Sequence, residues 1–163
     1  MLNELSVSTY DTAFKLAPPL RSEDDREAII EGIADGTIDA IASDHIAVDG
    51  DAKAQPFGPA QPGASGIDTL LALTLSLVHR ERISMLRAME CLSLAPASIL
   101  DIDGGALIEG AAADLVLFDP SASWVVRAAD FASNSRITPV EGLPVQGRVR
   151  SSWVGGMPVF TRS

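Results

Sequence analysis

The stretch Ile38-Asp39-Ala40-Ile41-Ala42-Ser43-Asp44-His45 decides the fold prediction, because it is an apolar run that ends in a carboxylate and an imidazole. A short apolar run of this kind predicts a buried strand over Ile38–Ser43. A second, shorter strand is predicted over Thr12–Ala17, where two prolines follow and end it.

A helix is predicted between these two strands. Ser22 begins it, Asp25 lies three residues later in an acidic first turn, and Gly36 follows its end. Strand, helix and strand in this order are typical of a parallel βαβ unit, so the fold class is α/β.

Asp44 is the residue that points most directly to a function. It would lie at the carboxyl end of a parallel strand, which is where α/β barrels carry their catalytic groups. Catalytic zinc usually has three protein ligands, mostly histidines, whereas the sequence has one cysteine and two histidines. Asp44 is therefore predicted to be one part of a metal site, and the alternative is an aspartate that caps a helix or binds loop amides.

The segment from His45 to Gly66 is rich in glycine and proline and is predicted to be a loop. Loops longer than about 15 residues are usually functional or disordered. Its Ala64–Gly66 backbone amides could bind a substrate anion, or Ser65 or Gly66 could simply cap the helix that follows.

The rest of the chain divides near residue 104. Before this point, three helices are predicted, over Ile67–His79, Ser84–Cys91 and Pro96–Leu100. After it, β-type runs cover Ala113–Asp119, Trp124–Val126 and Arg148–Val154, and a Gly155-Gly156 turn leads into a last strand. Residues 1–103 would thus form a helical α/β part and residues 104–163 a β-rich part.

Composition limits the classes of function. The formal net charge of −10 and the pI near 4.5 argue against nucleic acid or an anionic membrane surface as a partner. No run reaches the roughly 20 apolar residues of a membrane span. The one cysteine, Cys91, is predicted to be a buried inert thiol, which fits a reducing cytoplasm.

Four further polar residues have competing interpretations. Arg21 could bind a substrate carboxylate in a bidentate fork or pair with Glu23 or Asp24. His45 is predicted to be a packed group without a role of its own, and His79 a structural group at a helix end. Lys53 is predicted to be a solvated loop charge.

Three segments carry a resemblance to a known family. Lys15–Arg21 (KLAPPLR) is similar to a K-x-N-P-P-L-R string, and Ser43–His45 is similar to the start of a D-H-A-P-H string on a last barrel strand. Gly105–Asp119 is similar to a G-x-[IL]-x-x-G-x-x-A-D-L-[VI]-[VL]-x-D stretch. The chain resembles the C-terminal portion of the amidohydrolase superfamily, and within it the dihydroorotases.

This resemblance implies the last strands and helices of a metal-dependent TIM-type barrel, followed by a small β domain. It implies interconversion of carbamoyl aspartate and dihydroorotate at a binuclear zinc site. Asp44 would be metal ligand and general acid/base, and Arg21, Ala64 and Gly66 would lie near the substrate. The family's remaining zinc ligands belong upstream of the matched segments, so this chain by itself is expected to bind zinc poorly and to be inactive.

Two positions depart from the family strings. Ala17 stands where the family has Asn, and Val48 stands where it has the final His. Neither side chain can hydrogen-bond a substrate. These departures suggest a different substrate or a non-catalytic member, such as a partner of aspartate transcarbamoylase. Because two barrel strands cannot close a sheet, we expect self-association, a second polypeptide that supplies the remaining strands, or a rearranged fold.

Overall fold

The computed structural model describes residues 2–162, which form two compact units that alternate along the chain. The first unit contains the residues up to Gly32 together with Ser43–Leu70 and Val125–Leu143. The second unit contains Ile33–Ala42, Leu71–Trp124 and the residues from Pro144 onward. The predicted boundary near residue 104, which separates a barrel part from a β part, stays a prediction.

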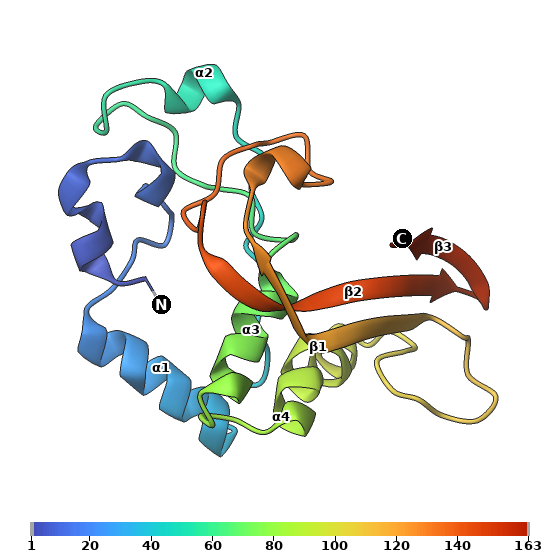
Figure 1. Ribbon diagram of the computed structural model, residues 1–163. Coiled ribbons are helices and arrows are strands. Elements are labelled where there is room, and N and C mark those ends of the chain that lie inside the picture. Colours follow the sequence, from blue (N-terminus) through green and yellow to red (C-terminus); the bar gives the residue numbers. More distant parts are fainter. Residues whose placement is uncertain (1, 163) are drawn as a thin grey trace. The chain divides into compact units, whose positions relative to one another are not determined.

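The first unit is built from short helical turns and long loops (Figure 1). The turns are three 3-10 helices, over Glu4–Thr9, Thr12–Phe14 and Ala128–Asp130, and the short helix α2 (Gly50–Lys53). Most of the longer helix α1 (Glu23–Asp35) also belongs to this unit. Side chains begin three of the turns, because Asn3, Asp11 and Asp49 each accept a backbone N–H two residues later. Short polar residues therefore set where the chain turns.

Helix α1 begins and ends where the sequence predicts. The Ser22 hydroxyl accepts the Asp25 backbone N–H at 3.1 Å, which satisfies one orphan donor of the first turn. Gly36 follows the helix with a φ of 88°, the left-handed conformation typical of a helix C-terminus.

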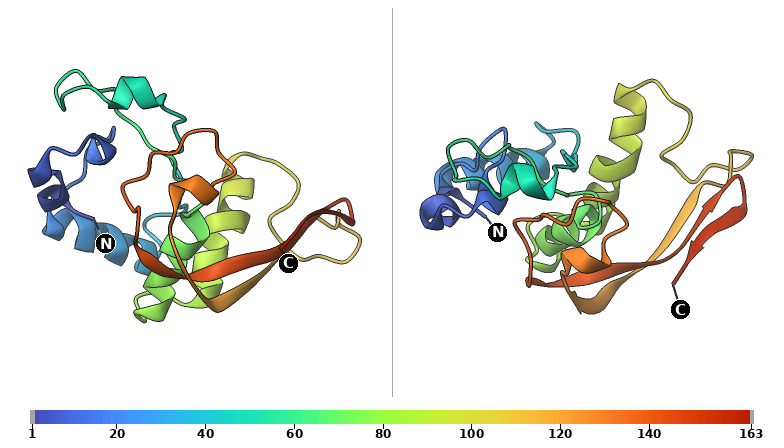
Figure 2. Two further views of the ribbon diagram at one scale, coloured as in Figure 1. Left: turned by 45° about the horizontal axis from the view of Figure 1, so that its top comes forward. Right: turned by 90° about the horizontal axis from the view of Figure 1, so that it is seen from above.

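The second unit combines short helices with a three-stranded sheet (Figures 1 and 2). Its helices are α3 (Leu70–His79), α4 (Met85–Met89), a π-helix (Glu90–Leu94) and α5 (Ala95–Ile99). The strands β1 (Leu115–Val125), β2 (Pro144–Val154) and β3 (Met157–Thr161) lie in the order β1-β2-β3. The predicted Gly155-Gly156 turn is confirmed, because both glycines have positive φ and Val154 pairs with Met157 across an antiparallel hairpin.

Apolar contacts hold each part of the second unit together. Ile33, Ile83, Ala88 and Cys91 form a buried cluster, and burial raises the pKa of the Cys91 thiol. Gly147 of β2 lies close to Leu75 of α3, which is fully buried, so the helix packs directly on the strand. The prediction that Cys91 is buried is therefore confirmed.

Two predicted strands are absent from the structure. Thr12–Phe14 is a 3-10 helix, and Ile38–Ser43 forms no strand. A parallel strand needs a neighbour that takes up its backbone hydrogen bonds, and within residues 2–162 the one sheet is β1-β2-β3. The Ile41 N–H instead donates to the Cys91 carbonyl at 3.0 Å.

Candidate functional site

Asp44 lies in the first unit, on a backbone conformation that few residues adopt. Its φ is 42°, in the left-handed region, where Asp and Asn are the most frequent residues after Gly. Its side chain is exposed and makes no hydrogen bond or ion pair within residues 2–162. A strained backbone that presents an unengaged carboxylate is typical of a functional position.

His45 joins Asp44 to two other segments of the same unit. Its Nδ1 accepts the backbone N–H of Gly66 at 3.2 Å, and its Nε2 lies 3.3 Å from the Ser133 hydroxyl oxygen. The imidazole is therefore packed, as predicted, but it makes a specific contact on each ring nitrogen.

Two glycines let the loop approach the Asp44 segment closely. A Cβ on Gly66 would lie 2.4 Å from the Ser43 carbonyl oxygen, so no other residue fits there without movement. Gly63 has a φ of 115° and lies against Ile46, and the Ile46 N–H donates to the Ala64 carbonyl at 3.0 Å. The structure thus brings Asp44 and the predicted Ala64–Gly66 segment together.

Most of the backbone amides predicted to bind a substrate anion already have partners. The Gly66 N–H donates to His45, and the Ser65 N–H donates to the Ile137 carbonyl at 2.8 Å. In the described part of the chain, the Ala64 N–H donates to no acceptor. Ala64 thus carries the one amide of the segment without an acceptor among the described residues, although Ala64 itself is buried.

Arg21 lies on the surface of the first unit and does not contact these residues. Its Nε is 3.2 Å from the Asp25 carboxylate, one turn further into α1, and its side chain is 64% exposed. The pairing with a nearby acid is present, although the partner is Asp25 rather than Glu23 or Asp24. A role in binding substrate stays a prediction.

A buried set of serines supports the site and was not singled out by the sequence. The Ser65 hydroxyl donates to the Ser135 carbonyl at 2.9 Å, and the Ser135 hydroxyl donates to the Val48 carbonyl at 3.0 Å. Both serines are buried. No local pattern marks Ser135, because its hydrogen-bond partners lie 70 and 87 positions away in the sequence.

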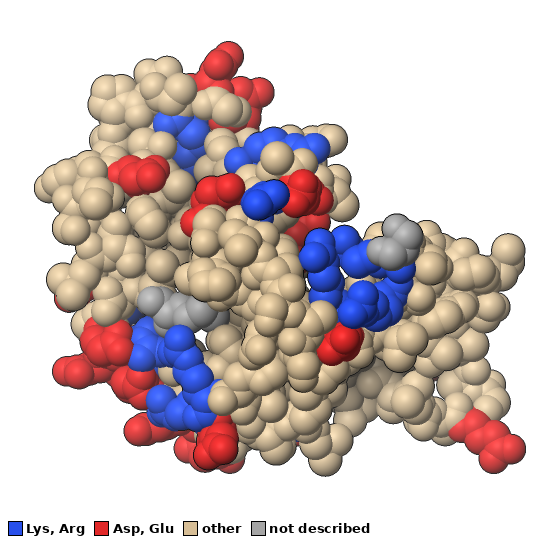
Figure 3. Space-filling model, viewed as in Figure 1, with Lys and Arg blue, Asp and Glu red and all other residues tan. Residues whose placement is uncertain are grey.

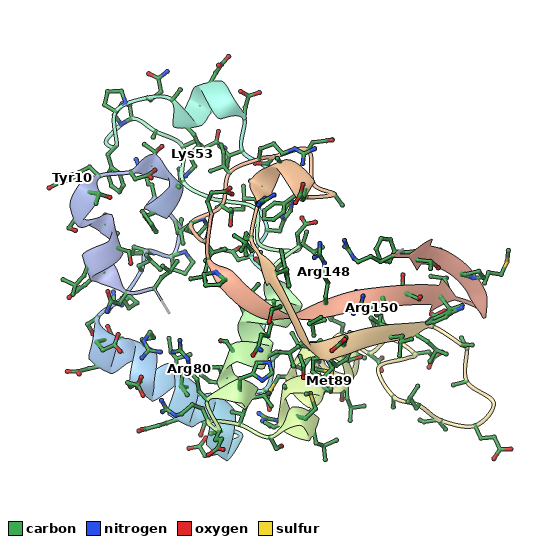
Figure 4. All side chains as sticks on the ribbon, viewed as in Figure 1. Tyr10, Lys53, Arg80, Met89, Arg148 and Arg150 are labelled. Atoms are coloured by element: carbon green, nitrogen blue, oxygen red, sulfur yellow. The ribbon has the colours of Figure 1, made fainter. Side chains whose placement is uncertain are left out.

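The prediction that Lys53 is a solvated loop charge is wrong. Lys53 is 5% exposed, and its ammonium donates to the Thr12 and Lys15 carbonyls at 2.7 and 3.0 Å. Burial lowers the pKa of Lys53. Figure 4 shows the side chain beside the turns of residues 4–14, to which it fastens the loop.

A second lysine reinforces this attachment. The Lys15 ammonium donates to the Phe57 carbonyl at 2.8 Å and lies 5.6 Å from the centre of the Phe57 ring. Tyr10 packs edge-on against the same ring. Two lysines therefore hold the loop through backbone carbonyls, and neither ammonium has a carboxylate partner within residues 2–162.

The described residues do not form a complete zinc site. No group of three or more His, Cys, Asp or Glu side chains within residues 2–162 could hold a metal ion. Asp44 has the chemistry of a single ligand, and both nitrogens of His45 are engaged by Gly66 and Ser133. A full set of ligands would need residues beyond this set.

Comparison with known proteins gives a consistent family. The profile of the Amidohydrolase family matches residues 5–159. The chain is 38% identical over 160 residues to a dihydroorotase of Anaplasma phagocytophilum and 42% identical over 161 residues to a dihydroorotase of Desulforapulum autotrophicum. Each match covers 98–99% of this chain, but only 36–38% of the length of the relative.

Solved structures agree in fold. The L-hydantoinase (dihydropyrimidinase) of Arthrobacter aurescens has a TM-score of 0.93 at 28% identity, and the chain covers 37% of it. The dihydropyrimidinase of Brevibacillus agri has a TM-score of 0.89 at 22% identity. Within residues 2–162, no helix is long and apolar enough to cross a membrane. The chain belongs to the amidohydrolase family, and its α/β architecture is that of the C-terminal part of an amidohydrolase barrel with a β-rich segment.

Proposed function

We propose that this chain is the C-terminal part of a dihydroorotase-like cyclic amidohydrolase, which interconverts carbamoyl aspartate and dihydroorotate in pyrimidine biosynthesis. Two observations support the proposal: the chain is 38% identical over 160 residues to a dihydroorotase, and the Asp44 carboxylate is exposed and has no partner within residues 2–162. We place the protein in the cytoplasm, in keeping with its single buried cysteine.

In this proposal, Asp44 holds or moves a proton at the ring nitrogen or carbonyl of the substrate, because its carboxylate is not engaged elsewhere. The Ala64 N–H and the Arg21 guanidinium would bind the substrate carboxylate. Zinc would be held by Asp44 only together with ligands outside the described residues.

A second candidate is a non-catalytic member that binds a partner such as aspartate transcarbamoylase. Two side chains favour it. Val48 is 3% exposed and Ala17 is apolar, so neither can supply the polar contact that the family has at these positions. Losing a polar contact to a substrate would cost about 1–3 kcal/mol of binding free energy at each position.

Zinc content and dihydroorotate turnover distinguish the two. The chain would be assayed by itself and after mixing with the part of the Anaplasma phagocytophilum dihydroorotase that the match does not cover. We expect no turnover by the chain, and zinc uptake with turnover by the mixture. Asp44→Asn should lower the turnover by at least about 10²-fold, whereas Asp51→Asn, on the exposed turn of α2, should not.

A mixture that takes up no zinc and turns over nothing would contradict the enzyme proposal. Co-migration of the chain with aspartate transcarbamoylase in size-exclusion chromatography would then support the non-catalytic candidate.

A further inference from the structure

We infer that His45 is a positioning residue, which fixes the backbone around Asp44 by holding Gly66 and Ser133 through a single imidazole tautomer. The contacts of His45 fix its place in the first unit, and its role in a reaction rests on the proposed function.

The hydrogen bonds select one tautomer of the ring. The Gly66 backbone N–H can only donate, so the Nδ1 that faces it at 3.2 Å must carry a lone pair. In the neutral ring the proton then lies on Nε2, which donates to the Ser133 hydroxyl oxygen at 3.3 Å. That oxygen also accepts the Ser135 backbone N–H at 3.2 Å, so both of its lone pairs are used.

Gly66 contacts the chain on both sides of Asp44. On one side, its α-carbon faces the Ser43 carbonyl so closely that a Cβ would lie 2.4 Å from the oxygen. On the other side, its N–H binds the ring of His45. One glycine thus restrains both neighbours of a residue in the left-handed conformation, while the Asp44 carboxylate remains exposed.

Gly66 therefore has a structural role instead of the predicted role in binding a substrate anion. Its N–H is used to orient His45 and is not available to a substrate anion, which leaves the Ala64 N–H for that purpose. Gly66 and His45 then act through Asp44, by holding its carboxylate where the proposed reaction needs it.

The tautomer is measurable in the 163-residue protein without metal or substrate. The sequence has two histidines, so ¹⁵N-histidine labelling of the His79→Gln variant leaves the His45 ring as the one signal. In alkaline buffer, we expect the nitrogen shifts of the Nε2–H form. The Nδ1–H form, or a mixture of the two, would overturn the inference.

Amide hydrogen exchange tests the contact to Gly66. In His45→Ala, the Gly66 amide should exchange at least about tenfold faster, whereas the Ser65 amide, which donates to Ile137, should not change. In His45→Asn, the side-chain oxygen can take the place of Nδ1, so protection of Gly66 should return.

Unchanged exchange at Gly66 in His45→Ala, or no recovery in His45→Asn, would contradict the inference. If His45→Ala does not fold, the tautomer in the His79→Gln protein and the exchange in His45→Asn decide. Because neither experiment uses activity, a failed turnover assay leaves this result standing, and a failed tautomer result leaves the proposed reaction standing.

Discussion

The ammonium of Lys53 is buried in the first unit and is held by backbone carbonyls of a distant segment. It lies in a Gly/Pro-rich loop but donates to two carbonyls of a segment about 40 residues earlier, at sequence separations of 41 and 38. No local pattern encodes such a contact, so sequence reasoning places the side chain in solvent.

Lys53→Met should destabilise the first unit. The substitution removes the hydrogen bonds from the Lys53 ammonium to the Thr12 and Lys15 carbonyls, although each carbonyl keeps a backbone N–H donor. A hydrogen bond to a charged group contributes about 1.5–3 kcal/mol to the free energy of unfolding. Urea denaturation followed by circular dichroism would measure the loss. Lys15→Met is the matched comparison, because it removes the other lysine that donates to a backbone carbonyl in this region. If Lys53→Met leaves the unfolding free energy unchanged, the contacts of Lys53 to Thr12 and Lys15 are contradicted.

The pH dependence of stability gives a second test of the same residue. Because burial lowers the pKa of Lys53 below the ordinary value of 10.5, the unfolded chain binds more protons than the folded one between these two values. The wild-type free energy of unfolding should therefore rise, relative to that of Lys53→Met, as the pH increases through this range. A difference between the two proteins that is independent of pH up to 10.5 would show that the pKa is not lowered.

Glu23 affects the pH dependence of the unfolding free energy on the acid side. Hydrogen bonds from Arg26 and then Asn3 lower its pKa from 4.5 to about 2. A lowered carboxyl pKa stabilises the fold above 4.5, and this stabilisation is lost as the pH falls toward about 2. Glu23→Gln should thus flatten the acid side of the stability profile, measured by thermal unfolding between pH 2 and 5; Glu31→Gln, on the same helix, serves as control.

At the scale of elements, the sequence predicts what local chemistry determines. Ser22 and Gly36 locate α1, and Gly155-Gly156 locates the hairpin, because a cap and a turn depend on a few adjacent residues. Helices α3, α4 and α5 likewise lie within or close to their predicted ranges.

Sequence reasoning was wrong where an element depends on a distant partner. Thr12–Ala17 and Ile38–Ser43 have the apolar character of strands but lack a hydrogen-bonding neighbour within residues 2–162. The candidate site is likewise predictable only where the signal is local. Asp44 and Gly66 stand out in their own segments, whereas nothing near Ser133 in the sequence indicates its contact with His45, 88 positions earlier.

Packing between α3 and β2 can be tested at Gly147. Its φ is 103°, and a Cβ there would lie 2.4 Å from Cδ1 of the buried Leu75. Gly147→Ala should therefore cost about 1–2 kcal/mol for the left-handed conformation and about 1–3 kcal/mol more for overpacking.

Gly142→Ala is the matched control, because Gly142 also has a positive φ but has no atom within 4 Å of such a Cβ. Placing Gly147→Ala in a Leu75→Ala background should recover the overpacking part of the loss, as a double-mutant cycle of unfolding free energies would show. Equal effects of the two glycine substitutions would mean that the helix and strand do not pack as described.

At the scale of the whole molecule, the sheet has two open edges and many exposed apolar side chains. β1 and β3 are the edges of the sheet. Figure 3 shows a group of Lys and Arg side chains over β2 and the end of β3, where Figure 4 labels Arg148 and Arg150, and uncharged side chains toward the turn between the two strands. Several exposed apolar residues lie on these edge strands: Val116, Leu117, Val159 and Phe160. Open edges of this character pair readily with other chains.

We therefore expect the protein to self-associate through the sheet in a concentration-dependent way, in spite of its net charge of −10. Val159 is 61% exposed on the edge strand β3, so Val159→Lys places a charge where a second strand would pair and should shift the population toward monomer. Light scattering coupled to size-exclusion chromatography would measure the mass across a dilution series.

Gln55→Lys adds the same charge to the exposed loop of the first unit, so an equal shift in both variants would indicate a general charge effect rather than edge pairing. A wild-type protein that stays monomeric at every concentration would mean that the exposed edge strands do not suffice to bind a second copy. Any partner that pairs with these strands would then have to be a different protein.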